Sequence, residues 1–252
     1  MIVIGLGSGR SGTASLAKLL NAQQEALCFH EMNPSCVRFE GTPRPILNTI
    51  EEFGFIESGG ETSRLTVDLA RPVSAAAYDR LCAMPRVRLI GDIAFYYLSY
   101  VELIAAHNPK VRFVCLKRDK TATVESWLRH STIRRWPSKR LADRLSALIT
   151  RQKYYTHRNP WVAHDGSRWE IDPVWDKCFP KMKAGTRRGA IEQYWDYYYG
   201  RIDRIAEEIP ERLMIVETET LQDHEAQSRI LSFCGYDPPE HIYTQAHIHK
   251  SA

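Results

Sequence analysis

The first twenty residues constrain the fold most strongly, because they combine an apolar run, a glycine-rich loop and a helical pattern. The run "IVIGL" (2–6) is dense in β-branched side chains, as in a central parallel strand. The loop "GSGRSGTAS" (7–15) follows, and Leu16, Leu19 and Leu20 then recur at helical spacing. When a glycine turn joins a strand to a helix, the backbone N–H groups of the turn and of the helix N-terminus can point towards a bound anion. We therefore expect an anion-binding loop here.

The rest of the chain continues this alternation of strands and helices. Apolar runs predict further strands over 25–31, 87–93, 111–118 and 212–221. Helical patterns occupy 13–22, 46–53, 73–83, 100–108, 121–130, 138–152, 187–209 and 225–236. Alternation of this kind predicts an α/β fold with a central parallel sheet flanked by helices, and ligands at the carboxyl ends of its strands. The length of 252 residues suits a single domain over 1–252, in which 33–75 and 152–186 would form acceptor-pocket or lid segments.

Composition excludes several other classes of protein. The net charge of +4 permits an anionic ligand without requiring nucleic acid. No stretch approaches 18 uninterrupted apolar residues, so we expect no membrane span, and the chain starts with a strand-like run rather than a secretory signal. The six cysteines form no CxxC pair, which argues against a zinc site and for reduced thiols. We expect a cytoplasmic protein without a zinc site.

The glycine loop itself leaves two interpretations open. The nucleotide-hydrolase loop GxxxxGK[ST] ends in a lysine and a hydroxyl that binds magnesium, whereas this loop has Thr13 and Ala14 there. The loop therefore keeps an anion cradle and a forked cation, Arg10, but loses the magnesium ligand. The spacing also reads as the G-x-G-x-x-G of a dinucleotide-binding fold, although Glu31 is the only acidic residue suitably placed after it.

The pattern "GxGRSGTxSLxxLL" resembles the 5′-phosphosulfate loop of sulfotransferases that use 3′-phosphoadenosine 5′-phosphosulfate (PAPS). The resemblance implies a P-loop NTPase-like three-layer fold, PAPS as sulfuryl donor, 3′-phosphoadenosine 5′-phosphate (PAP) as product, and no metal. It also implies that the donor's 5′ end is bound by Gly9, Arg10, Ser11, Gly12, Thr13 and Ala14.

A second signature of the same family is an arginine that ends an apolar strand, with a serine eight residues later on a helix. In "VRFVCLKRDKTATVESW" these residues are Arg118 and Ser126, although Lys120 replaces the family's usual proline. An arginine fork and a helix hydroxyl can hold a 3′-phosphate, which PAPS has and ATP lacks. The resemblance thus assigns Arg118 and Ser126 to the 3′-phosphate.

An acceptor hydroxyl that receives a sulfuryl group must lose its proton, which requires a base within hydrogen-bond reach. Glu31 in "CFHE" resembles the catalytic glutamate of the tyrosylprotein members of the family. His30 and Asp92 are rival bases, because both are expected where strands end at the same crevice. Arg10 is the candidate for stabilising charge on the transferred group.

We therefore interpret the chain as a sulfotransferase that modifies a hydroxyl or amine of an unidentified small-molecule, glycan or peptide acceptor. An atypical P-loop kinase or NTPase and a non-catalytic nucleotide-binding module remain the alternatives. The basic run that begins at Arg129 could serve the 3′-phosphate side or an acidic acceptor, but is more often a solvated helix face.

Overall fold

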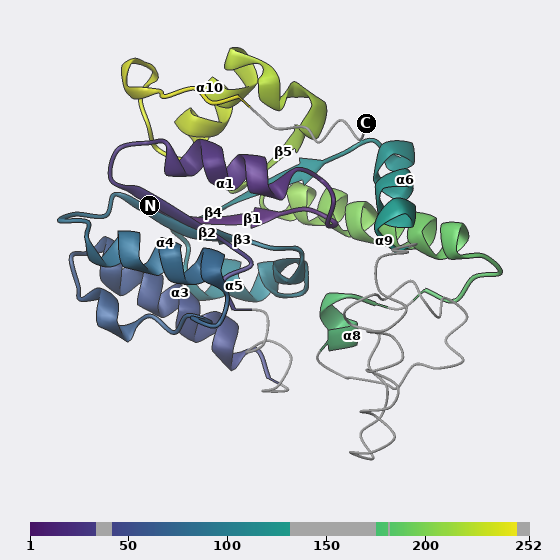
Figure 1. Ribbon diagram of the computed structural model, residues 1–252, viewed down its shortest axis with the longest axis horizontal. Coiled ribbons are helices and arrows are strands. Elements are labelled where there is room, and N and C mark those ends of the chain that lie inside the picture. Colours follow the sequence, from purple (N-terminus) through teal and green to yellow (C-terminus); the bar gives the residue numbers. More distant parts are fainter. Residues whose placement is uncertain (34–41, 132–174, 181, 246–252) are drawn as a thin grey trace.

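Five parallel strands form one sheet at the centre of the molecule (Figure 1). The computed structural model describes residues 1–33, 42–131, 175–180 and 182–245. All five predicted strands are confirmed; β1 has the predicted bounds, and the other four are one to five residues shorter than predicted. They are β1 Ile2–Leu6, β2 Ala26–His30, β3 Leu89–Ile93, β4 Val111–Lys117 and β5 Leu213–Glu217.

Helices connect the strands. They are α1 Thr13–Asn21, α3 Arg44–Glu57, α4 Pro72–Cys82, α5 Val101–His107, α6 Lys120–Ser131, α8 Trp175–Cys178, α9 Arg187–Glu208 and α10 His224–Phe233. Short 3-10 helices span Thr62–Arg64, Phe95–Tyr100, Thr218–Gln222 and Pro238–Glu240. Helix α3 is longer than the predicted 46–53. The predicted helix over 138–152 lies outside the described residues.

The local signals behind these helices are visible in the structure. Asp119 caps α6, since its Oδ1 accepts the Ala122 amide at 2.7 Å. Thr186 caps α9 by accepting the Gly189 amide at 3.0 Å. Gly235 takes a left-handed φ of 86° directly after α10, which satisfies the end of that helix.

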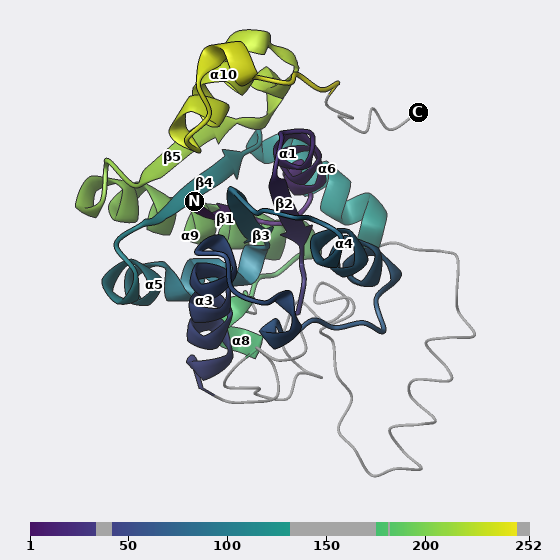
Figure 2. The same ribbon diagram turned by 90° about the vertical axis from the view of Figure 1, so that its left-hand side faces the viewer.

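Two hydrophobic clusters cover the two faces of the sheet, which gives three layers (Figures 1 and 2). On one face α1 and α10 pack over Val3, Val114 and Leu116. On the other, α3, α5 and α9 pack over Ile4 and Phe113. No helix in the described part of the chain is long and apolar enough to cross a membrane. The cysteines described, Cys28, Cys82, Cys115, Cys178 and Cys234, carry free thiols.

The strand order is β2-β3-β1-β4-β5, which decides between the two interpretations of the glycine loop. Dinucleotide-binding folds place the second strand beside the first, in the order 3-2-1-4-5-6. Here β3 lies between β1 and β2, so the fold is the P-loop NTPase-like α/β type and not a dinucleotide fold. Glu31, at the end of β2, therefore lies one strand further from the loop than a dinucleotide fold requires.

The first predicted acceptor-pocket or lid segment, 33–75, is mostly helical in its described part. Between residues 42 and 75 it contains α3, the Thr62–Arg64 turn and the start of α4. Of the second predicted lid segment, 152–174 and residue 181 lie outside the described residues. The remainder contributes α8 and Phe179, which is buried against the sheet-facing aromatics.

Candidate active site

The glycine loop between β1 and α1 is held in an unusual backbone conformation. Gly9, Arg10 and Gly12 have φ values of 78°, 59° and 82°, a left-handed region that glycine enters freely and arginine does not. Neighbouring side chains crowd both glycines. A Cβ at Gly9 would lie 2.7 Å from the Trp127 ring, and one at Gly12 2.8 Å from Cγ2 of Thr218. Glycine is therefore required at both positions.

Ser11 places a hydroxyl inside this loop. The residue is fully buried, and its Oγ has no hydrogen-bond partner among the described residues. The Oγ lies over Gly7, where any added Cβ would collide with it. A buried hydroxyl without a partner is costly, so Ser11 Oγ is a candidate group for contact with an anion in this loop.

Three arginines gather beside the loop. Arg10 Nε donates to Ser126 Oγ at 3.1 Å, and Arg118 Nη1 donates to the Arg10 carbonyl at 2.8 Å. Partial burial lowers the pKa of Arg10, and the neighbouring cations Arg118 and Arg129 lower it further. The side chains of Arg10 and Arg118 thus join the loop to the end of β4 and to helix α6.

Helix α9 supports the loop from beneath with a row of aromatic side chains. The Tyr198 hydroxyl accepts the Gly7 amide at 2.9 Å and lies 3.3 Å from the Phe95 carbonyl, to which it donates. The Tyr199 hydroxyl donates to the Leu116 carbonyl at 2.8 Å and lies 3.2 Å from Ser8 Oγ.

Side-chain hydrogen bonds also fix the backbone of Arg118, at the end of β4, and of Ser11 in the loop. Trp195 Nε1, also on α9, donates to the Arg118 carbonyl at 3.1 Å. Thr218 Oγ1, which follows β5, donates to the Ser11 carbonyl at 2.8 Å. Sequence reasoning identified none of these supporting residues. The aromatic spacing in "QYWDYYYG" was the available signal, but it is also the spacing of an ordinary buried helix face.

His30 and Glu31 stand at the neighbouring end of β2. His30 Nε2 lies 3.0 Å from the hydroxyl of Thr13, the first residue of α1, which links this strand end to the loop. Glu31 Oε2 lies 3.4 Å from Nη2 of Arg71, and both side chains are about one third exposed. Glu31 has a φ of 52°, so it shares the left-handed conformation of Arg10. Strained non-glycine residues cluster at functional sites.

Asp92 lies in the core rather than at the surface of the crevice. The residue is fully buried inside β3, and its carboxylate accepts hydrogen bonds from Tyr96, Tyr97 and the Met32 amide. Burial raises the pKa of Asp92, while the bonds from Tyr97, Tyr96 and Met32 oppose that shift. The structure thus places His30 beside Thr13, places Glu31 beside Arg71, and buries Asp92 in the core.

Ala14 is exposed at the second position of α1, where the hydrolase loop would carry its magnesium-binding hydroxyl. Across the described ranges, no three His, Cys, Asp or Glu side chains come together as a set of metal ligands.

No protein-family model matches the chain. No curated protein matches it either. Among solved structures, it is similar to a sulfotransferase from Alicyclobacillus acidocaldarius, with 14% identity, 93% of this chain and 81% of that chain covered, and a TM-score of 0.47. It is also similar to the sulfotransferase domain from the curacin biosynthetic pathway, with 14% identity, coverage of 94% and 75%, and a TM-score of 0.45.

Proposed function

We propose that this protein is a PAPS-dependent sulfotransferase that transfers a sulfuryl group to a hydroxyl or amine of its acceptor. The observation that carries the proposal is the junction of the two predicted anion motifs. Arg10 of the loop donates to Ser126, and Arg118 donates to the Arg10 carbonyl. The two motifs are more than 100 residues apart in the sequence, yet they form one continuous cationic site suited to a ligand with anionic groups at two ends.

In this proposal each end of the donor has its own ligands. The loop amides, the Arg10 guanidinium and the buried Ser11 hydroxyl take the 5′-phosphosulfate. Arg118 and Ser126 take the 3′-phosphate, and Arg129 adds positive charge to the same cluster. The unpartnered Ser11 hydroxyl would gain its missing hydrogen bond when the loop holds an anion.

The proposed reaction is an in-line transfer. The acceptor oxygen or nitrogen forms a bond to sulfur while the bond from sulfur to the bridging phosphate oxygen breaks and PAP leaves. Arg10 stabilises the negative charge that develops on the bridging and sulfuryl oxygens, as cations do in phosphoryl transfer. The acceptor proton passes to the Glu31 carboxylate.

Glu31 is the preferred base for two structural reasons. Its carboxylate is partly exposed and lies 3.4 Å from Arg71, so an acceptor group can reach it. His30 Nε2, by contrast, is already within hydrogen-bond distance of Thr13 at the start of α1. We therefore assign His30 to supporting the loop, and Glu31 to proton transfer.

The kinase or NTPase alternative requires a magnesium ligand at the end of the loop, and Ala14 cannot supply one. The alternative of a non-catalytic binding module requires only the anion site. A sulfotransferase should lose turnover but keep PAP binding when Glu31 is replaced, whereas a binding module should bind PAP without any turnover.

Calorimetric titration with PAP tests the proposed donor site. Ser126→Ala should weaken PAP binding by about 10- to 150-fold, because a hydrogen bond to a charged group contributes about 1.5–3 kcal/mol. Thr121→Ala, an exposed change on the same helix, is the matched control and should bind PAP like wild type. Equal dissociation constants for all three proteins would contradict the assignment of Ser126.

A further inference from the structure

Asp92 is a fully buried carboxylate with an unusually complete set of donors. The hydroxyls of Tyr96 and Tyr97 each donate to its Oδ2 at 2.9 Å. The Met32 amide lies 3.2 Å from both carboxylate oxygens. Taking a carboxylate out of water is expensive, and a core that needed only volume would be better served by apolar side chains. The charge of Asp92 is therefore used for something other than packing.

The hydrogen bond from the Met32 amide to Asp92 indicates that the carboxylate fixes the backbone next to Glu31. Met32 directly follows Glu31, so the bond to Asp92 fixes the peptide that leaves Glu31. The Glu31 amide donates to the Ile93 carbonyl at 3.0 Å, which fixes the peptide on the other side. Ser74 Oγ, buried near the start of α4, reaches the Met32 carbonyl at 3.4 Å. Together these contacts hold Glu31 at its φ of 52°, which a glutamate rarely adopts unaided.

We propose that Asp92, together with Tyr96 and Tyr97, is a positioning device that holds Glu31 in its left-handed conformation, with its carboxylate at Arg71. Asp92 is then a positioning residue and not a rival base. The inference rests on the proposed function only for the role of Glu31 as base; the conformational claim stands by itself.

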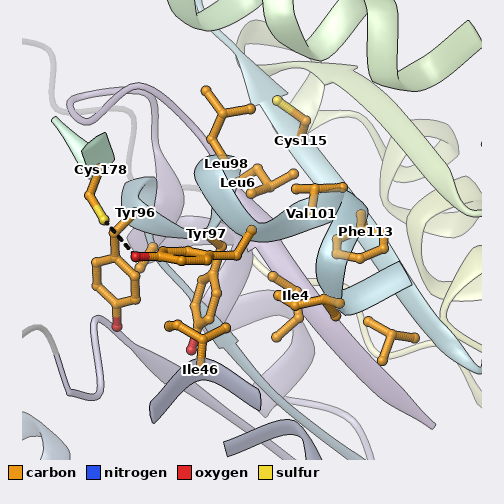
Figure 3. Packing of buried hydrophobic residues seen from close by; sticks show 14 of the residues in the cluster. Ile4, Leu6, Ile46, Tyr96, Tyr97, Leu98, Val101, Phe113, Cys115 and Cys178 are labelled. Carbon is orange, nitrogen blue, oxygen red and sulfur yellow. Dashed lines mark hydrogen bonds between the residues drawn. The ribbon is translucent and has the colours of Figure 1, made fainter. Parts of the chain in front are cut away.

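The packing of the two tyrosines supports this assignment. Their rings lie in the core near Ile46, and their hydroxyl ends point the same way (Figure 3). The ring centroids are 4.8 Å apart, so the two hydroxyls reach one carboxylate oxygen together. Tyr100, in the same 3-10 helix, is equally buried but pairs with Cys178 instead. It therefore offers a matched control.

The test observes Glu31 directly, by carbon-13 NMR of protein labelled at the glutamate side-chain carboxyl. The Glu31 signal is assigned by its loss in Glu31→Gln. Tyr97→Phe and Asp92→Asn should move this signal and its titration midpoint, and crystal structures should show Glu31 outside the left-handed region. Tyr100→Phe should leave the signal in place. An unchanged Glu31 signal and titration in folded Tyr97→Phe and Asp92→Asn would overturn the proposal.

A second variant and a separate binding measurement keep the test decisive. If Asp92→Asn does not fold, Tyr97→Phe decides, because it removes one hydroxyl and keeps the ring. PAP titration of the same proteins separates the two claims. Absence of PAP binding by wild type would contradict the proposed function, while the NMR result would still decide the role of Asp92.

Where transfer from PAPS is measured, kcat of Tyr97→Phe should fall roughly 10-fold with an unchanged KM for PAPS. In the Glu31→Gln background the same change should have no further effect, because residues that act through one group are not additive. A full additional loss in that background would mean that Asp92 does not act through Glu31.

Discussion

At the scale of single residues, two residues with a strained backbone mark the proposed reaction centre. Arg10 and Glu31 both occupy the left-handed region, and each is held there by hydrogen bonds to its neighbouring peptides. Sequence reasoning found both residues, because their types and spacing matched a known motif. It could not find the contacts that hold them, since Arg118 and Asp92 are remote in the sequence and each was assigned a different role.

Glu31→Gln tests the division of labour between binding and proton transfer. The amide has the shape of the carboxylate but cannot accept a proton, so transfer from PAPS should fall by about 10²–10⁴-fold while PAP affinity stays within twofold. Single-turnover kinetics and calorimetry measure the two quantities. His30→Gln should instead slow transfer less. A Glu31→Gln enzyme that retains wild-type turnover would mean that another group is the base, whereas PAP binding by a wild-type protein that shows no turnover would support the binding module.

The buried carboxylate of Asp92 should also leave a signature in pH-dependent stability. Because burial raises its pKa in the folded state, the folded protein holds more protons than the unfolded chain between the two pKa values. Wild type should therefore gain stability relative to Asp92→Asn as pH falls from 7 towards 4. Tyr96, Tyr97, the Met32 amide, His30 and Cys28 surround the group.

Urea denaturation of both proteins at pH 7 and pH 5 measures this difference. The same comparison in a His30→Gln background removes the contribution of His30, whose charge interacts with Asp92. A stability difference that shrinks on acidification would mean that the folded-state pKa of Asp92 is not raised.

At the scale of elements, α9 has a function that its sequence pattern did not disclose. The helix was predicted over 187–209 from its apolar spacing and is confirmed at Arg187–Glu208. The pattern defines a buried face but says nothing about which groups the tyrosine hydroxyls meet. Two of them meet the loop, through the Gly7 amide and Ser8. Helix α9 thus packs in the hydrophobic core and also holds the glycine loop in place.

Removing the Tyr198 hydroxyl leaves the buried Gly7 amide without its acceptor. Tyr198→Phe should lower the free energy of unfolding by about 1–3 kcal/mol and weaken PAP binding, because the loop loses a fixed point. Tyr197→Phe is the control, since Tyr197 lies on the same helix but is exposed. Guanidinium denaturation and PAP calorimetry measure both effects. Equal stability and affinity in the two variants would remove α9 from the support of the site.

At the scale of the whole molecule, the strands were predictable and their order was not. Buried parallel strands appear in the sequence as continuous apolar runs, so all five were found. Their order depends on how the crossovers pack across the sheet, which no local pattern encodes. That order places β3 between β1 and β2, and Arg10, Glu31 and Arg118 follow the carboxyl ends of β1, β2 and β4 at the same end of the parallel sheet.

The central claim is that the carboxyl end of the sheet binds a nucleotide that carries a 3′-phosphate, and that this binding needs no magnesium. Thermal unfolding in saturating PAP, compared with ATP and magnesium, tests it most directly. At 100 times its Kd a ligand stabilises a protein by about 2.7 kcal/mol, a shift of roughly 5–10 °C in Tm for a chain of this size. We predict a shift of that order with PAP, unchanged by EDTA, and little shift with ATP and magnesium. A larger shift with ATP that EDTA abolishes would contradict the account.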